Sequence, residues 1–162
     1  MNARPFALRL SLCLLLTPAL SLTAAEKRVC PDLATASQVG NCPSEADLKY
    51  TFNGFCSDDR RMYTGDTEVC TDYQAYRRLK NVAPWESAAG DFMAYVSCEL
   101  PAARIQTLRA QGVTVSRAAQ ITLLTCDYGE GIRFTHRSRL SCKVEGDGHC
   151  ANSAQPCGAI CE

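Results

Sequence analysis

The ten cysteines that follow residue 25 constrain this fold more than any other feature of the sequence. The chain has 11 cysteines in all, but Cys13 lies in an apolar N-terminal stretch, apart from the others. The ten are Cys30, Cys42, Cys56, Cys70, Cys98, Cys126, Cys142, Cys150, Cys157 and Cys161. In an exported protein, an even number of cysteines at this density predicts structural disulfides, here five bonds within one chain.

The order of the cysteines leaves their pairing open, because ten cysteines allow about 945 arrangements. Two expectations rest on the predicted local structure. Cys56 is expected to pair with Cys70 across a turn between two helices. Cys98 is expected to pair with a cysteine of the predicted sheet, either Cys126 or Cys142.

The first 25 residues are organised like a cleaved secretory signal peptide. Arg4 and Arg9 precede an apolar run that ends in the small residues 23–25, where we expect cleavage. An uncleaved anchor is the alternative, but Pro18 interrupts the run, and a spanning helix needs about 20 apolar residues. Export places the protein in a bacterial periplasm or outside the cell. The absence of an N-x-Ser/Thr glycosylation acceptor fits a bacterial source.

Removal of 25 of the 162 residues leaves 137, the length of one domain. We therefore expect a single disulfide-rich domain over 26–162, with a Cys-rich C-terminal tail from about residue 145. Loss of Arg4 and Arg9 leaves 15 Lys and Arg against 17 Asp and Glu, so the net charge becomes −2. No second long apolar stretch follows, and the sequence predicts no membrane span after the signal is removed.

Helical patterns dominate the first half of the chain and strand patterns the second. Three helices are expected, over 44–55, 67–80 and 101–112. Three strands are expected, over 92–98, 121–128 and 132–144. Because the last two strands are consecutive, the pattern favours an antiparallel sheet over alternating βαβ units. The predicted fold class is α+β, with N-terminal helices packed on a small antiparallel sheet and about five disulfides. Trp85, placed in a loop after Pro84, is expected to be either a core residue or an exposed recognition residue.

The last two strands are expected to form a hairpin through the loop Gly129-Glu130-Gly131. A three-residue loop sets Cys126 opposite Phe134 on an apolar face. It also sets Asp127 opposite Arg133, which is a favourable charge pair. A two-residue loop would mix the two faces, so the three-residue loop is the predicted one.

A row of cations on the last strand is the candidate binding site. Its members are Arg133, Arg137, Arg139 and Lys143, and no acidic residue shares their face of the strand. A solvated sheet face is one interpretation, and a binding surface for an acidic protein or an anionic glycan is the other. No aromatic residue shares this face, which argues against single-stranded nucleic acid as the partner.

The two histidines of the mature chain are the only candidates for acid–base chemistry. His136 falls on the apolar face, where a structural role is expected, and His149 lies in the cysteine-rich tail. With Lys143 they could hydrolyse a phosphodiester, but no catalytic motif surrounds them. The tail spacing lacks the C-x2-C of zinc ribbons, so we expect disulfides there, rather than a metal at His149 or a redox pair at Cys157 and Cys161.

These observations favour an exported, disulfide-linked binding or inhibitor-like protein that binds an anionic partner. No catalytic residue, metal or cofactor is predicted. The alternative is a small secreted hydrolase or toxin with His136 or His149 as the acid–base residue. A structural component of the cell envelope is a third interpretation.

Overall fold

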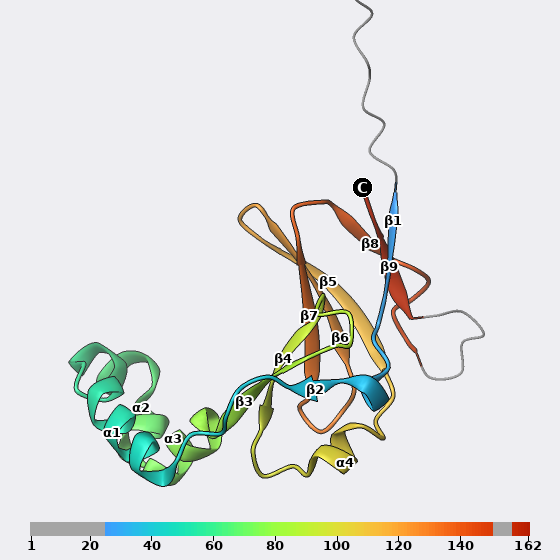
Figure 1. Ribbon diagram of the computed structural model, residues 1–162. Coiled ribbons are helices and arrows are strands. Elements are labelled where there is room, and N and C mark those ends of the chain that lie inside the picture. Colours follow the sequence, from blue (N-terminus) through green and yellow to red (C-terminus); the bar gives the residue numbers. More distant parts are fainter. Residues whose placement is uncertain (1–24, 151–156) are drawn as a thin grey trace, which may run out of the picture.

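The computed structural model describes residues 25–150 and 157–162. The predicted signal peptide therefore lies almost entirely outside the described residues. Two antiparallel sheets and a separate group of helices make up this part of the chain (Figure 1). The larger sheet has the strand order β2-β3-β4-β7-β6-β5, and the smaller sheet the order β1-β9-β8.

The strands are short and occur along the whole described chain. They are β1 (Glu26–Val29), β2 (Ser37–Gln38), β3 (Val82–Glu86), β4 (Met93–Ser97), β5 (Gly112–Ala118), β6 (Ile121–Asp127), β7 (Arg133–Ser138), β8 (Cys142–Val144) and β9 (Gly158–Cys161). The helices are α1 (Glu45–Phe55), α2 (Thr67–Thr71), α3 (Tyr73–Lys80) and α4 (Ala102–Ile105). A 3₁₀ turn covers Leu33–Thr35, and a π-helical turn covers Arg61–Gly65. The α+β class is confirmed, with more strand than the sequence predicted.

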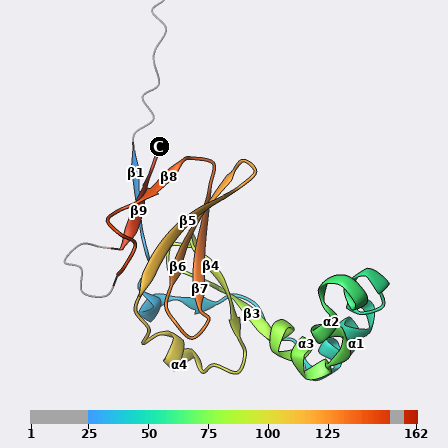
Figure 2. The ribbon, with the colours of Figure 1, turned by 180° about the vertical axis from the view of Figure 1, so that it is seen from behind.

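The sequence predicts helices packed on the sheet, but the helices between β2 and β3 do not pack on it. Together with the turns between them, α1, α2 and α3 form a separate body, here called the helical lobe (residues 45–80), beside the larger sheet (Figures 1 and 2). The main hydrophobic core contains no residue of this lobe. The lobe buries its own apolar side chains, among them Leu48 and Tyr76. Both faces of the larger sheet are therefore free of these three helices.

Local signals explain where the helices begin and end. Ser44 caps α1, and its side chain and that of Asp47 form a reciprocal capping box. The predicted helix over 67–80 is broken at Asp72, because this side chain accepts a hydrogen bond from Gln74 N at 2.8 Å and starts α3. The predicted helix over 101–112 is reduced to α4.

The predicted hairpin is confirmed in its register. Cys126 pairs with Phe134, and Asp127 with Arg133. Gly129, Glu130 and Gly131 form the loop with φ of 76°, 53° and 77°. Two of these three left-handed positions are glycines, the residue type that adopts this conformation without steric cost. Glu130, the exception, is ion-paired with Arg104.

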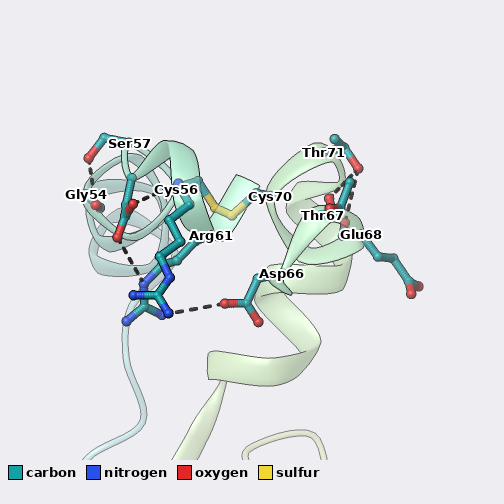
Figure 3. The surroundings of a disulfide bond; sticks show 11 residues. Gly54, Cys56, Ser57, Arg61, Asp66, Thr67, Glu68, Cys70 and Thr71 are labelled. Carbon is teal, nitrogen blue, oxygen red and sulfur yellow. Dashed lines mark hydrogen bonds and ion pairs between the residues drawn. A yellow bond between two sulfur atoms is a disulfide. The ribbon is translucent and has the colours of Figure 1, made fainter. Parts of the chain in front are cut away.

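All ten cysteines of the described chain are paired. The bonds are Cys30–Cys126, Cys42–Cys98, Cys56–Cys70, Cys142–Cys161 and Cys150–Cys157. The predicted bond between Cys56 and Cys70 is confirmed, and it joins the end of α1 to α2 within the helical lobe (Figure 3).

The predicted partners of Cys98 are wrong. Cys98 directly follows β4, and its amide donates to the carbonyl of Asn81, the last residue before β3. This position is where the chain leaves the helical lobe. Cys42 lies where the chain enters the lobe, so the Cys42–Cys98 bond closes the neck between lobe and sheet. Cys126 faces the core and takes Cys30 as its partner instead.

The core lies between the inner face of the larger sheet, α4 and the 3₁₀ turn. Ile105 and Leu108 point into it. Trp85 is also buried, on β3 and not in a loop. Tyr128 is 1% exposed, packs edge-on against Phe134, and donates its hydroxyl to the carbonyl of Pro31 at 2.5 Å.

Tyr128→Phe should lower the free energy of unfolding by about 1–2 kcal/mol, because a part-buried carbonyl loses its donor. Burial raises the pKa of Tyr128. Below about pH 10 Tyr128 is neutral in both the folded and the unfolded state, and its full contribution to stability is present. Above about pH 10 the tyrosine ionises more readily in the unfolded state, so this contribution is lost as the pH rises. Urea denaturation at about pH 7 and about pH 11 checks this. The wild type should lose more stability at the higher pH than the variant, and equal losses would contradict the expectation.

Candidate binding face

The structure divides the predicted row of cations between two sheets. Arg133 and Arg137 lie on β7, Arg139 lies in the bend that follows, and Lys143 lies on β8 in the smaller sheet. The prediction of one continuous strand over 132–144 is therefore wrong. β7 ends at Ser138, whose hydroxyl accepts a hydrogen bond from Leu140 N at 3.0 Å, and the chain then crosses to β8. All four cations are exposed.

Arg133 and Arg137 line a groove on the side of the larger sheet that faces away from the core, here called the outer face. The groove has a volume of about 640 Å³. Met93 and Tyr95 on β4 and Leu123 on β6 contribute apolar surface to it. Met93 is 46% exposed and Tyr95 is 72% exposed. Because side chains alternate along a strand, these residues point outward while Ala94 and Val96 fill the core.

The groove follows the junction between β4 and β7. These strands pair at a single position, Met93 with Thr135, whereas β7 pairs with β6 along the whole length of β7. Near this position a hydrogen bond from a side chain to the backbone also links the two segments. His136 Nδ1 lies 2.7 Å from the backbone carbonyl oxygen of Asp91. The weak pairing leaves the outer face hollowed between two strands.

The charges of the outer face are only partly neutralised. Arg133 forms an exposed ion pair with Asp127, at 3.3 Å from Nε to Oδ2. Arg137 has no ion-pair partner within residues 25–150 and 157–162. The carboxylate of Asp91 accepts hydrogen bonds from Arg28, at 3.1 Å, and from Ser87, at 2.9 Å. The groove therefore combines a net positive charge with exposed apolar side chains.

The residues of the alternative, hydrolytic interpretation are not brought together. His136 is half-buried on β7 against Phe92. His149 lies beyond the opposite edge, where it bridges to Gly112 of β5. Three strand spacings separate the two backbones, roughly 14 Å. Lys143 belongs to the smaller sheet. Among the described residues, the hydrogen-bond partner of the His136 side chain is a backbone carbonyl.

The C-terminal cysteines form disulfides as the sequence predicts. Cys157 pairs with Cys150, and Cys161 with Cys142, so Cys157 and Cys161 do not form a pair with each other. Glu145, four residues before His149 in the sequence, is ion-paired with Lys27 at 2.9 Å. In the part of the chain that the structure describes, no three His, Cys, Asp or Glu side chains cluster closely enough to hold a metal ion.

The apolar half of the groove was missed at the level of sequence. The run Met93-Ala94-Tyr95-Val96 was expected to form a strand, but not to expose Met93 and Tyr95. A signal for this was present. Alternation implies that small Ala94 and β-branched Val96 share one face and the two large residues the other. Only the partners of β4 decide which of these faces is buried.

The fold and the groove define a small, disulfide-linked α+β protein with a basic and apolar sheet face. Comparison with protein-family models, with curated proteins and with solved structures finds no match to this chain. Among the described residues, no helix has the length and apolar character needed to cross a bilayer.

Proposed function

We propose that this chain is an exported binding protein and that its outer face binds an acidic segment of another protein. The observation that carries the proposal is the groove between β4 and β7, where Arg133 and Arg137 adjoin the exposed side chains of Met93 and Tyr95. Arginine, tyrosine and methionine are enriched in protein interfaces, and arginine and tyrosine are frequent hot-spot residues. The cations give the groove its preference for an acidic partner.

The apolar part of the groove favours a protein over an anionic glycan. Met93 and Leu123 offer aliphatic and thioether surface, to which leucine or phenylalanine side chains of a partner are complementary. A glycan of high negative charge would instead need several cations that converge on its sulfate or carboxylate groups. Arg139 and Lys143, the two further cations of the predicted row, lie outside the residues that line this groove.

The number of disulfides supports export. Disulfides form and persist chiefly in oxidising compartments, such as the bacterial periplasm or the extracellular medium, and this chain has five. They support the interpretation of residues 1–25 as a signal peptide. The binding function proposed here needs no cofactor.

Titration of the mature protein with a fluorescein-labelled peptide of aspartate and leucine tests the proposal. We expect Tyr95→Ala to weaken binding about tenfold, the effect of losing one aromatic contact residue. The fold should be unchanged, because Tyr95 is 72% exposed. Tyr50→Ala is the matched control, because Tyr50 is 80% exposed but lies on α1 in the helical lobe.

Two results would argue against an acidic protein segment as the partner. One is an equal loss of affinity in the Tyr50 and Tyr95 variants, which would place the contact elsewhere or make it nonspecific. The other is heparin binding that is tighter than peptide binding and unaffected by Tyr95→Ala, which would favour an anionic glycan. Binding to the outer face should also weaken as salt is added, since the Debye length falls from about 10 Å at 0.1 M to about 3 Å at 1 M.

A further inference from the structure

We infer that the acidic segment lies across the strands of the larger sheet, with a run of apolar residues over β2, β3 and β4 and its acidic residues over β7. This inference rests on the proposed function and names the kind of segment that the outer face selects. It is carried by three outward-facing apolar residues, Val39, Pro84 and Tyr95, here called the apolar strip, which continue the groove towards the edge of the sheet.

Strand register brings the apolar strip into one row. Pro84 on β3 pairs with Tyr95 on β4. Val39 directly follows β2, and its amide donates a hydrogen bond to the carbonyl of Pro84 at 2.9 Å. Residues that pair across antiparallel strands share one face of the sheet. Ala83 and Trp85, on either side of Pro84, are buried in the core, so Pro84 and its row lie on the outer face.

The apolar strip is exposed, and its outer end is held in place. Val39 is 50% exposed, and Pro84 is partly exposed. A Cβ atom on Gly40 would lie 2.6 Å from Pro84 Cγ, so the chain after Val39 packs closely on the proline ring. Exposed apolar surface that is continuous over several residues is typical of an interaction site. The apolar strip therefore extends the binding surface from the groove to the edge of the sheet.

The charges of the outer face determine which end of the segment lies over which strand. Glu86 on β3 pairs with Met93 on β4 and, by alternation from buried Trp85, lies on the outer face. An acidic side chain over β3 would be repelled by Glu86. Over β7 it would be attracted by Arg133 and Arg137, which line the groove. The acidic end of the segment is therefore expected over β7, and its apolar end over the apolar strip.

The width of the sheet sets the length of the segment. Continuing the register of Met93 and Thr135 by two residues places Arg133 beside Tyr95, at the end of the row that begins with Val39. Three strand spacings separate β2 from β7, or roughly 14 Å. An extended chain rises about 3.3 Å per residue and covers this distance with about five residues. The outer face therefore selects a short apolar run followed directly by acidic residues.

The test compares fluorescein-labelled peptides of equal length and composition. In the block peptides a run of leucines adjoins a run of aspartates, and in the alternating peptide the two residues alternate. Side-chain contacts do not determine the chain direction, so the block peptide is made in both orders. One of the two block peptides should bind the wild type about tenfold more tightly than the alternating peptide, which cannot cover the apolar strip without placing aspartates on it.

Val39→Ser tests the apolar strip apart from the groove. It should weaken binding of the tighter block peptide about three- to tenfold, the effect of losing one aliphatic contact. Binding of the alternating peptide should be almost unchanged, because Val39 does not line the groove. Val29→Ser is the matched control, because Val29 is 41% exposed but lies on β1 in the smaller sheet. This control should bind both kinds of peptide like the wild type.

A nitroxide label on the tighter block peptide gives a readout that needs no variant. Placed at the leucine end, it should broaden the amide signal of Val39 more than that of Arg137, and at the aspartate end the reverse. If the block and alternating peptides bind equally, if Val39→Ser behaves like Val29→Ser, or if the broadening is reversed, the inference is wrong and the binding proposal stands. If no peptide binds the wild type, the proposed function itself is wrong.

Discussion

Replacement of both Cys30 and Cys126 by alanine should lower the free energy of unfolding by about 5 kcal/mol. In the chain-entropy model, the stabilisation by a disulfide grows with the length of the loop that it closes. The Cys30–Cys126 bond has a sequence separation of 96, for which the model gives about 4.7 kcal/mol. Cys126 is also fully buried in the main core, so truncation of its side chain removes apolar contacts in addition.

The Cys56–Cys70 bond provides the matched control. Its sequence separation is only 14, which corresponds to about 3 kcal/mol in the same model. Because the helical lobe contributes no residue to the main core, this loss should be confined to the lobe. Urea denaturation followed by Trp85 fluorescence, which reports on the sheet, and by helical circular dichroism distinguishes the two cases. A larger loss of sheet stability in the Cys56/Cys70 variant would contradict this division of the fold.

The double variant Arg133→Glu/Arg137→Glu should weaken binding of the aspartate–leucine peptide roughly 30- to 100-fold at physiological salt. Each reversal removes an attraction to the acidic segment and introduces a repulsion in its place. Both side chains are exposed, so the fold should be kept. Arg133→Glu also sets two acids opposite each other on β6 and β7, which costs a little stability. A thermal melt of the unbound variant measures that cost separately.

A variant with the same change in net charge separates the groove from the overall field of the protein. Lys49→Glu/Arg78→Glu changes two exposed cations of the helical lobe, away from the groove. Its affinity for the peptide should fall less than about threefold, the effect of exposed charges beyond a Debye length. Equal losses in the two double variants would mean that net charge alone, and not the outer face, determines binding.

The hairpin and the first helix could be predicted from the sequence because their signals are local. Alternation and two glycines determine the register of β6 and β7. Ser44 and Asp47 form the cap of α1 within four consecutive residues. At Asp72 two local signals compete. The helical periodicity of 67–80 favours one continuous helix, but the N-cap formed by Asp72 starts a new helix there.

The missed strands depend on contacts between distant parts of the chain. β3 contains Pro84, which argues against a strand because it cannot donate a backbone hydrogen bond. The carbonyl of Pro84 accepts a hydrogen bond from Val39 N at 2.9 Å. The backbone nitrogen and carbonyl of Pro84 therefore face the end of the short strand β2, and not β4. No hydrogen bond between β3 and β4 is lost there. Only the tertiary arrangement shows that proline is tolerated at this position.

The candidate site was predicted in part for the same reason. The parity of β7 correctly exposes Arg133 and Arg137 and turns Phe134 inward. The same alternation continues through Lys143, and nothing in it marks the crossing from one sheet to the other. Tyr95 joins the groove through the contact of β4 with β7, which lie about forty residues apart in sequence. Disulfide partners such as Cys42 and Cys98 are non-local in the same sense.

A nuclear magnetic resonance titration of the isotope-labelled mature protein with the aspartate–leucine peptide tests the central claim most directly. The outer-face account predicts that the backbone amide shifts cluster on β4, β6 and β7, at Met93, Tyr95, Leu123, Arg133 and Arg137, and that the helical lobe is unaffected. Shifts that cluster on the helical lobe or on the smaller sheet, with the amides of Tyr95 and Arg137 unchanged at saturation, would contradict it.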